Sequence, residues 1–399
     1  MIIFAFKHNN QLLVALTIYL LEGIMENFAM NLWLEYFLGK PEKDDIGEMY
    51  AQLARELPKV MSVVATRHCN LQCKHCIFQK ERQYFSNGVA LEIAAKTIVS
   101  QMLPNPIVVH EGRIFELKHL SWLQEIRQIR PDSKIGMIDN GSYSEHISKI
   151  KSAGFKFDWL DISVDGPERI HNFQRDSKNS FATAIEGIRN AQEILTTGGE
   201  VNSLMTLTKI NYASVLETCK TLPEQVSQWH ITTVTPTRSE LKKLTLSGNE
   251  FKISWNQIKL VNVLRVVVLK IYEVSDMLKL VNAVGGVKFF EAFEKAQIGF
   301  SSVSFVLDGV LVRYFPKSMA PKETFMLDAD AVYRVPYVIS HTLAELNREA
   351  LGKYTIGKVT AESNFRLLYK KCVIGWRENF SREAFKEEAF IFQQIKNLQ

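Results

Sequence analysis

Short apolar runs alternate with longer amphipathic stretches from residue 58 onward, which is the pattern of a parallel α/β domain. The predicted strands cover residues 60–65, 107–109, 135–138, 159–164, 202–207 and 230–234. The helices predicted between them cover residues 88–103, 120–129, 144–153, 181–195 and 213–222. The sequence therefore predicts an α/β fold with six strand and helix repeats within residues 58–238.

The pattern changes after about residue 238. Residues 238–249 are polar and read as a linker, and residues 253–274 form an apolar stretch that predicts one buried helix. An Asp-Gly turn between alternating apolar residues predicts a hairpin over 305–312, and a second hairpin is expected over 324–338. With helices closing the chain, residues 239–399 are predicted to be an α+β capping region.

The first 57 residues are predicted to be a helical extension. Residues 12–21 are apolar, but the run is short for a membrane span, and Glu22 and Glu26 follow it instead of a small-residue cleavage site. An amphipathic or partly buried helix is expected, with no membrane role. Met25 and Met30 are alternative start sites, so no function is assigned to this region.

Composition excludes several classes of protein. The chain has 399 residues, 46% of them hydrophobic, and a net charge of +5 with basic and acidic residues interleaved. Nucleic-acid binding is not indicated, because phosphate backbones are bound by contiguous basic faces. Five cysteines, an odd number and mostly clustered, argue against a secreted disulfide framework and for a reducing, cytoplasmic compartment.

Three of these cysteines are close together, at Cys69, Cys73 and Cys76. A zinc site with His68 or His75 as fourth ligand is one interpretation, although zinc sites usually combine two short cysteine pairs. The other is a cubane iron–sulfur cluster with one iron open to a small ligand, because such clusters normally take four cysteine sulfurs. Cys219 and Cys372 stand alone in the sequence and supply no second pair.

The spacing Cys69-x3-Cys73-x2-Cys76, with the aromatic ring of His75 before the last cysteine, resembles the signature of the radical SAM superfamily. This resemblance implies one 4Fe-4S cluster whose open iron binds S-adenosylmethionine (SAM). It also implies reductive cleavage of SAM to a 5′-deoxyadenosyl radical that abstracts hydrogen from a substrate. The expected fold is then a partial (β/α)6 barrel, and the expected electron donor is a flavodoxin or ferredoxin.

Polar residues at the predicted strand ends extend the resemblance. Glu111 follows the second strand where the family has Gly-Gly-Glu, but His110 and Val109 replace the glycines. The acid is expected to hold the amino group of SAM, and the alternative is a solvated loop residue. Asn140, in Asp-Asn-Gly, matches the family's Thr-Asn-Gly after the third strand, although Asn-Gly alone only signals a turn.

The fourth repeat carries the segment Ser163-Val164-Asp165-Gly166-Pro167, which is similar to one in the peptide and sulfatase maturases. By this resemblance Ser163 and Asp165 meet the ribose or methionine end of SAM. Arg175 is where that branch binds the SAM carboxylate, for which a guanidinium fork is suited. His75 is expected beside the adenine. The alternative is an ordinary loop followed by an exposed helix charge.

The C-terminal region resembles the SPASM and Twitch extensions of those maturases, but it lacks the cysteines of their auxiliary clusters. Arg313 and the two residues after it stand where the first such cysteine is expected. Only Cys372 follows, and one thiolate cannot hold a cluster. The sequence therefore predicts a single cluster, with the C-terminal region closing the barrel and shaping the substrate pocket.

Two hypotheses follow from these motifs. The favoured one is a radical SAM enzyme, and the Asp-Gly-Pro resemblance favours a peptide or protein substrate. The alternative is a non-enzymatic protein that binds zinc or an iron–sulfur cluster for structure or redox sensing. Cys219, Cys372 and Tyr143 could donate hydrogen to a product radical, but each is more simply a packing residue.

Overall fold

The computed structural model describes most of the predicted α/β domain and parts of the C-terminal region. The described residues are 60–66, 68–77, 88–111, 115–298, 302–317, 326–327, 332–334, 355–367, 369 and 382–398. The predicted N-terminal extension and Cys372 lie outside them, so the helical prediction for residues 1–57 and the single-cluster prediction stay predictions. The division into three domains also stays a prediction.

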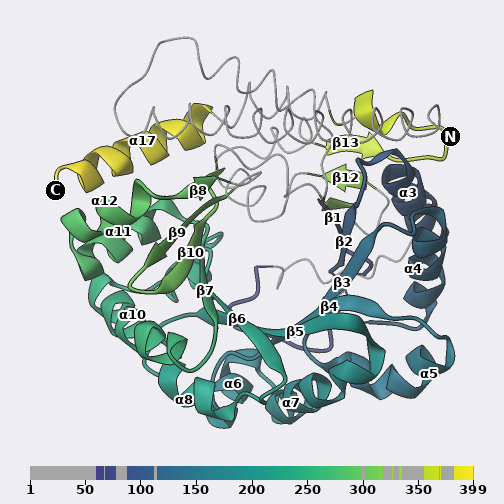
Figure 1. Ribbon diagram of the computed structural model, residues 1–399, viewed down its shortest axis with the longest axis horizontal. Helices are drawn as coiled ribbons and strands as arrows, with labels where there is room; N and C mark the ends of the chain where they lie inside the picture. Colours follow the sequence, from purple (N-terminus) through teal and green to yellow (C-terminus); the bar gives the residue numbers. More distant parts are fainter. Residues whose placement is uncertain are drawn as a thin grey trace, which may run out of the picture.

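One curved sheet organises the molecule, and its strands follow in the order β13-β12-β11-β1-β2-β3-β4-β5-β6-β7-β10-β9-β8. Neighbours from β1 to β7 pair in parallel. The strands are β1 (Val60–Val63), β2 (Ile107–His110), β3 (Lys134–Asp139), β4 (Phe157–Ser163), β5 (Leu195–Leu207), β6 (Val226–Thr233) and β7 (Val267–Ile271). Figure 1 shows this sheet bending into an open arc with its helices outside. The predicted α/β partial barrel is confirmed.

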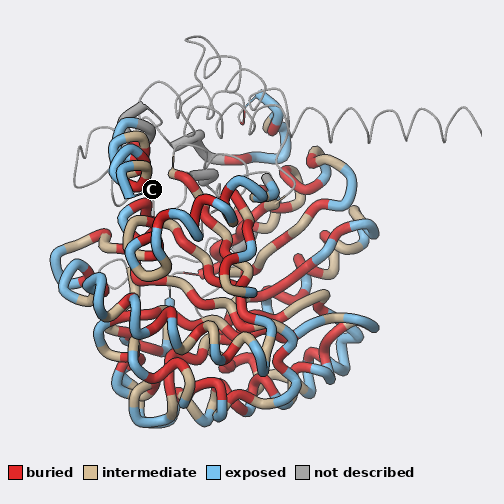
Figure 2. The backbone as a smooth tube through the Cα atoms, turned by 60° about the vertical axis from the view of Figure 1, so that its left-hand side comes forward, coloured by how far each residue is buried: buried red, intermediate tan, exposed pale blue. Residues whose placement is uncertain are grey.

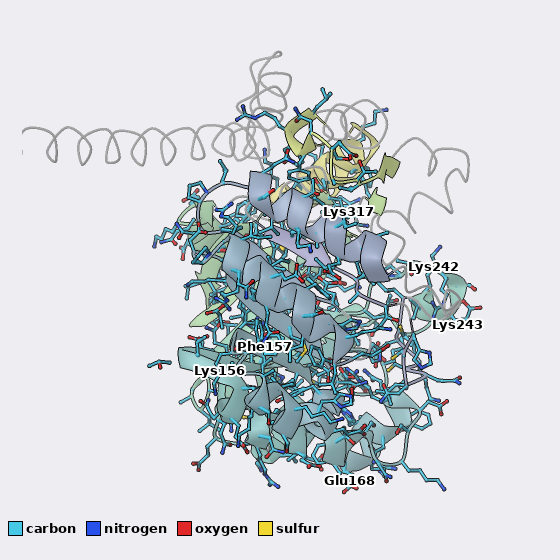
Figure 3. All side chains as sticks on the ribbon, turned by 90° about the vertical axis from the view of Figure 1, so that its right-hand side faces the viewer. Lys156, Phe157, Glu168, Lys242, Lys243 and Lys317 are labelled. Carbon is cyan, nitrogen blue, oxygen red and sulfur yellow. The ribbon has the colours of Figure 1, made fainter. Side chains whose placement is uncertain are left out.

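The helices that cover the outer face come between successive strands. They are α3 (Gly88–Gln101), α4 (Lys118–Ile129), η1 (Ser142–His146), α5 (Ile147–Ser152), α6 (Glu168–Arg175), α7 (Ser180–Asn190), η2 (Ala191–Ile194) and α8 (Val215–Thr221). Figure 3 shows α3 and α4 side by side on the outside of the sheet, and the two helices are in contact. Figure 2 shows that the strands are mostly buried while the helices alternate between buried and exposed residues, as expected of a layered α/β core.

The prediction of one long helix over residues 253–274 is wrong. The chain instead forms α10 (Gly248–Asn262) and then turns into β7, which extends the sheet beside β6. Ser247 caps α10 by accepting a hydrogen bond from the backbone N–H of Glu250 at 3.3 Å. The valines of β7 are β-branched, and a buried strand of this kind cannot be distinguished from a buried helix by apolar character alone.

The polar stretch predicted as a linker is also ordered in part. It contains the short helix α9 (Ser239–Lys242), and Figure 3 shows Lys242 and the following Lys243 at the rim of the molecule. Arg238 at its start donates to the carbonyl of Cys76 at 2.7 Å and to that of Ile77 at 3.2 Å. The segment therefore closes on the cysteine loop, a contact that the sequence did not predict.

Both predicted hairpins are confirmed, and they extend the two edges of the arc. β9 (Val303–Leu307) pairs with β10 (Val310–Tyr314) around Asp308 and Gly309, which have φ values of 52° and 80° as a two-residue hairpin turn requires. β10 pairs in parallel with β7. At the other edge, β11 (Met326–Leu327) pairs with β1 and with β12 (Val332–Arg334).

The remaining described elements lie beside these edges. They are α11 (Val274–Val284), α12 (Gly286–Phe293), β8 (Gln297–Ile298), β13 (Thr355–Lys358) and α17 (Arg382–Lys396). The helix α17 contacts α11, so the expected closing helix packs on the sheet end that carries β7 and β10. In the part of the chain described by the structure, no helix is long and apolar enough to span a membrane.

Candidate functional site

A cavity of about 450 Å³ opens at the carboxyl ends of the parallel strands, where α/β barrels hold their chemistry. In β4 and β5 alternate residues line it, Asp161 with Ser163 and Leu204 with Thr206, since successive side chains of a strand point to opposite faces. The lining residues predicted from the sequence are Cys69, Cys73, His75, Cys76, Glu111, Asn140, Ser163 and Arg175. The structure therefore brings all the predicted site residues to one cavity except Asp165.

The cysteine loop follows β1 and is fixed by backbone contacts. The backbone N–H of Lys74 donates to the carbonyl of Gln174 in α6 at 2.8 Å, and that of Cys76 donates to Cys73 at 3.1 Å. Cys73 is 7% exposed, and burial raises the pKa of its thiol to about 11, although the charge of Arg175 opposes this. Cys69, Cys73, Cys76 and the distant Cys219 are free thiols.

The three cysteine thiols are arranged for a cluster and not for a single metal ion. Among the described residues, no three His, Cys, Asp or Glu side chains are placed to hold a single metal ion. An iron–sulfur cubane binds each thiolate through a different iron atom, so it does not require three sulfurs to converge on one point. The donor set, three thiols on one cavity wall, fits such a cluster.

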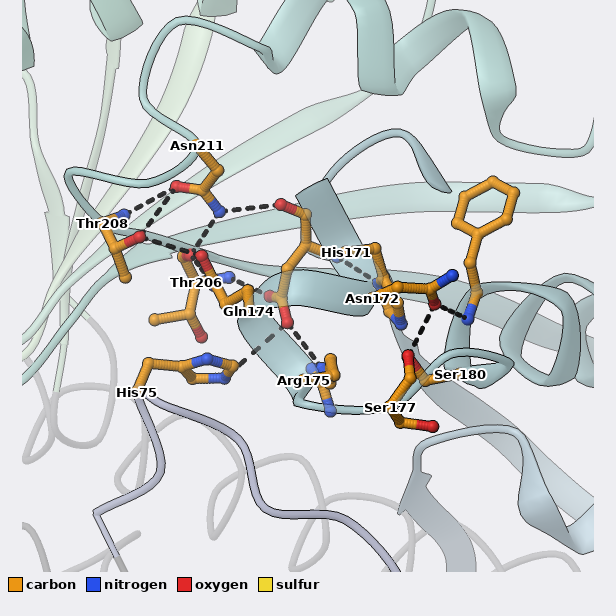
Figure 4. A network of polar contacts seen from close by, with 12 residues as sticks. His75, His171, Asn172, Gln174, Arg175, Ser177, Ser180, Thr206, Thr208 and Asn211 are labelled. Carbon is orange, nitrogen blue, oxygen red and sulfur yellow. Dashed lines mark hydrogen bonds and ion pairs between the residues drawn. The ribbon is translucent and has the colours of Figure 1, made fainter. Parts of the chain in front are cut away.

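Asp165 lies behind the cavity wall, fully buried at 0% exposure. Its Oδ2 accepts a hydrogen bond from Nε of Arg175 at 2.6 Å, and its Oδ1 accepts one from the backbone N–H of Thr206 at 2.9 Å. Nδ2 of Asn211 donates to the Asp165 carbonyl at 2.7 Å. Figure 4 shows this network joining α6 to the loops after β4 and β5. Asp165 therefore contacts Arg175 and not the cavity.

Charge pairing explains how a buried carboxylate is tolerated here. Burial alone would raise the pKa of Asp165, but Arg175, His75 and His171 lower it to about 2. The pKa of Arg175 is raised despite its burial, because Asp165 stabilises the guanidinium. At neutral pH both partners are charged, and the side chain of Arg175 is only 10% exposed. The guanidinium is thus held in one orientation at the cavity.

His75 lies near the same oxygen of Asp165 that accepts from Arg175, with its Nε2 at 3.7 Å from Oδ2 (Figure 4). Burial lowers the pKa of His75 to about 4, so the ring is neutral at pH 7. Its Nδ1 is buried and has no hydrogen-bond partner among the described residues. A buried nitrogen without a partner costs free energy, and at a cavity wall it fits a ligand that supplies the missing contact.

Glu111 enters the cavity from the end of β2. Ser62 in β1 donates to Glu111 Oε1 at 2.6 Å, and the backbone N–H of Glu111 donates to the carbonyl of Val63 at 2.8 Å. Burial, helped by the charge of Asp161, raises the pKa of the Glu111 carboxyl. A buried carboxyl of raised pKa at a cavity is a candidate for binding a cationic group, which would restore its charge.

Asn140 connects the end of β3 to the cysteine loop. Its Nδ2 donates to Oδ1 of Asn70 at 2.9 Å, and its Oδ1 accepts from the backbone N–H of Ser142 at 3.0 Å. Gly141 follows with φ of 94°, and a Cβ there would lie 2.5 Å from the carbonyl oxygen of Thr183. Only glycine fits this turn, so the Asn-Gly pair is required by packing as well as by the cavity.

Several functional candidates were missed by the sequence. Asp161 in β4 is two residues before Ser163 and lines the same cavity, where it accepts a hydrogen bond from Asn202 at 2.9 Å. His230 in β6 and Lys270 in β7 line the far side. The alternation of Asp161 with Ser163 was a usable signal. Lys270 could not be found, because its strand was read as part of a helix.

The three candidate hydrogen donors lie away from the cavity where the structure describes them. Tyr143 is 0% exposed and donates to the carbonyl of Gly187. Cys219 is 5% exposed in α8, and neither residue lines the cavity. Tyr143 and Cys219 are therefore packed in the core, as the alternative interpretation of the sequence expected. Cys372 lies outside the described residues.

Comparison with known proteins agrees with this architecture. Residues 63–222 match the family model described as radical SAM superfamily. A relative from Nitratidesulfovibrio vulgaris, "AdoMet-dependent heme synthase", is 26% identical over an alignment of 215 residues, and the match covers 49% of this chain and 55% of that protein. The match thus spans about half the length of this curated relative.

Two solved structures share the fold. One is anSMEcpe with bound AdoMet, at 14% identity and a TM-score of 0.53, covering 82% of this chain and 83% of that one. The other is SuiB of Streptococcus suis bound to precursor peptide SuiA, at 12% identity and a TM-score of 0.53, covering 84% and 71%. Radical SAM proteins use a 4Fe-4S cluster and SAM, and these are the cofactors of this domain. Residues 63–222 therefore form a domain of the radical SAM superfamily.

Proposed function

We propose that this chain is a radical SAM enzyme that uses a single 4Fe-4S cluster held by Cys69, Cys73 and Cys76. When bound, the cluster would supply the electron that cleaves SAM to methionine and a 5′-deoxyadenosyl radical, which abstracts hydrogen from the substrate. The observation that carries the proposal is the meeting of three free thiols, a fixed guanidinium and a buried carboxyl at one cavity.

The methionine end of SAM has an amino and a carboxylate group, and the cavity offers a partner for each. Glu111 is proposed to accept from the amino group, since a cation beside it would offset the burial that raises its pKa. Arg175 is proposed to bind the carboxylate. Its Nε is taken by Asp165, so the two Nη groups are the atoms that would meet a ligand. Asp165 then acts as a positioning residue through Arg175.

The nucleoside end is assigned to three residues on the same wall. His75 is proposed to lie beside the adenine, which a neutral ring with an unpartnered Nδ1 suits. Ser163 and Asn140 are proposed to hydrogen-bond the ribose or the methionine chain. The contact between Asn140 and Asn70 supports a role for Asn140 in holding the cysteine loop as well.

The substrate is proposed to be a peptide or protein. The SuiB structure of the same fold is described as bound to precursor peptide SuiA, and an anSMEcpe structure as bound to the Cp18Cys peptide. A flavodoxin or ferredoxin is proposed as the electron donor. A cytoplasmic location is proposed because the four described cysteines are all free thiols, as expected in a reducing compartment.

Anaerobic reconstitution followed by addition of dithionite and SAM tests the proposed reaction. We expect about four iron atoms per chain and release of 5′-deoxyadenosine. Cys73→Ala should lose both, whereas Cys219→Ala, which removes an equally buried thiol far from the cavity, should keep both. Zinc without iron, or SAM left intact by protein with a full cluster, would contradict the proposal.

A further inference from the structure

Arg238 bridges two parts of the cavity wall that are far apart in the sequence. It follows β6, whose last residue, Thr233, lines the cavity, and it directly precedes the short helix α9. Its side chain reaches back to the end of the cysteine loop. There Nη2 donates to the carbonyl of Cys76 at 2.7 Å, and Nη1 donates to that of Ile77 at 3.2 Å. One guanidinium thus holds two consecutive carbonyls of the loop.

The segment that carries Arg238 is itself fixed. Leu241 in α9 is 0% exposed, and the backbone N–H of Lys209, after β5, donates to the carbonyl of Leu244 at 3.0 Å. The side chain of Arg238 is 13% exposed, and its Nε lies 3.6 Å from a carboxylate oxygen of Glu240, which is 55% exposed. A pair with so exposed an acid contributes little. The guanidinium is therefore oriented mainly by its anchored helix and by the cysteine loop.

The cysteine loop meets a different guanidinium at each of its two parts. The charge of Arg175, from α6, interacts with the thiols of Cys73 and Cys69. Arg238, from the segment after β6, contacts the loop at Cys76 instead. Hydrogen bonds from an ionised donor are roughly twice as strong as those between neutral groups, and a guanidinium can donate two of them side by side. The third cysteine is therefore placed by a second cation.

We propose that Arg238 is a positioning residue for the cluster ligand Cys76 and that its charge raises the reduction potential of the cluster. The inference rests on the proposed function, because it concerns the cluster assigned to the same loop. The guanidinium fixes the backbone that carries the Cys76 thiol, so this ligand is held in place before a cluster is assembled. One-electron reduction adds negative charge to a cluster, and a cation held beside the loop stabilises that reduced form.

Arg265 provides a matched control elsewhere in the molecule. Its Nη2 donates to the carbonyl of Leu222 at 2.7 Å, and its Nη1 donates to that of Val226 at 3.3 Å, which is nearly the same contact with two carbonyls. Val226 begins β6, so this clamp is at the amino end of the strand, and none of its three residues lines the cavity. Arg265→Gln therefore removes a clamp of the same kind and the same charge without touching the cysteine loop.

The reduction potential of the full-length, cluster-loaded chain tests the proposal. It is measured by titration with dithionite in the absence of SAM, with the reduced cluster followed by electron paramagnetic resonance. Arg238→Gln should make the ratio of reduced to oxidised cluster about tenfold lower at a given potential, a downward shift of about 59 mV for one electron. Arg238→Lys keeps the charge and should restore most of the potential. Arg265→Gln should leave the potential unchanged.

Three results of this titration would overturn the proposal. They are an unchanged potential in Arg238→Gln, an equal fall in Arg265→Gln, and a fall that Arg238→Lys does not reverse. Release of 5′-deoxyadenosine by the unmodified chain is measured separately. A chain that holds a cluster but leaves SAM intact would contradict the proposed reaction, whereas the potentials of the variants would still decide the role of Arg238.

Hydrogen–deuterium exchange of the cluster-free full chain tests the clamp without the cluster. The peptide that contains residues 74–77 should exchange several times faster in Arg238→Gln than in Arg265→Gln, because exchange follows local opening of the backbone. Equal exchange of this peptide in the two variants would overturn the positioning role. If the unmodified chain bound no iron, the proposed function would fail, and the exchange rates would still decide whether Arg238 holds the loop.

Discussion

The two sides of the cavity handle charge in opposite ways. On the side of the cysteine loop, Arg175 is paired with the fully buried Asp165, which is itself held by Thr206. On the far side, Lys270 contacts a neutral imidazole and is adjacent to Arg313. A charge that is paired inside the protein is held in one geometry before any ligand arrives. On the far side, the charges of Lys270 and Arg313 instead help to keep the ring of His230 unprotonated.

The largest effect is expected from removing the guanidinium of Arg175 on the side of the cysteine loop, which we call the paired side. Arg175→Met leaves Asp165 charged and buried, which should lower the free energy of unfolding by about 3–5 kcal/mol. Urea unfolding of the cluster-free chain measures this. Adding Asp165→Asn to the variant should recover much of the loss, because the unpaired charge is then gone.

Lys151→Met provides the contrast, since Lys151 pairs with Glu193 on the surface with both side chains about half exposed. It should cost less than about 1 kcal/mol. If Arg175→Met cost no more than this surface variant, the pair with Asp165 would not be holding the guanidinium, and the contrast between the two sides would fail.

The difference between the two sides also explains what the sequence could and could not predict. Cys69 and Glu111 follow strands whose apolar runs are clear, and Ser163 ends such a strand. Their common location therefore followed from the carboxyl ends of parallel strands. Asp165 lies in a segment that the sequence identifies. Its position behind Arg175, however, depends on how α6 packs against two loops. A residue's partner across such a fold is set by tertiary structure.

Lys270 was missed for a different physical reason. Its strand is continuous in apolar character with the helix before it, and fully buried strands and helices share that character. Arg313 was noted only because it stands where a cysteine was expected. Its neighbour in space is fixed by the pairing of β10 with β7, which no local pattern contains. The far side therefore required the structure.

A second effect tests how rigidly the turn beside the cysteine loop is held. Gly141→Ala forces a Cβ to within 2.5 Å of the Thr183 carbonyl oxygen and strains a residue with φ of 94°. Left-handed backbone costs about 1–2 kcal/mol and overpacking about 1–3 kcal/mol more. Thermal or urea unfolding should show a loss of roughly 2–4 kcal/mol.

Gly154→Ala separates the two causes. Gly154 also has positive φ, 69°, but a Cβ there meets nothing within 4 Å. It should lose only the backbone part, about 1 kcal/mol. Equal losses in the two variants would mean that the Asn140 turn relaxes freely, so it could not fix the cysteine loop.

A third effect concerns Asp139, an acid on the paired side that has no cationic partner of its own. Burial raises its pKa to about 6, although hydrogen bonds from Tyr143 and Ser142 oppose this. The folded chain therefore binds its proton more tightly than the unfolded chain, and this contribution to stability is lost as pH rises from about 4 to 6. Asp139→Asn removes the titration. The variant should gain up to about 3 kcal/mol relative to the original chain across this range.

Asp132→Asn should change the pH dependence in the opposite direction. Arg130 and the backbone N–H of Asn105 hold the pKa of Asp132 well below its ordinary range, so its contribution is present at neutral pH and is lost on acidification. Unfolding measured from about pH 2 to 7 distinguishes the two variants, because the contribution of Asp132 is lost below about pH 4 and that of Asp139 between about pH 4 and 6. If both gave the same slope, the acid on the cavity wall would not be destabilised by burial.

The smallest effect is expected on the far side, where Lys270→Gln removes one of two charges that act on His230. Burial is the largest cause that lowers the pKa of His230 to about 3, followed by Lys270 and then Arg313. The pKa should rise in the variant but stay below 6.5, because the burial remains. NMR titration of the imidazole measures it, with Lys220→Gln, exposed on the outer helix α8, as the control that should not move it.

The shift in the pKa of His230 also affects the pH dependence of the chain's stability. His230 stays neutral in the folded chain, whereas the unfolded chain takes up a proton on this ring as pH falls below 6.5. The free energy of unfolding therefore decreases as pH falls through this range. With Lys270 replaced, that loss should shrink by an amount on the order of 1 kcal/mol, the equivalent of about one pKa unit. A pKa that did not move would mean that Lys270 does not donate to Nδ1. The low pKa of His230 would then come from burial and from Arg313, and the far side would not hold its ring neutral through Lys270.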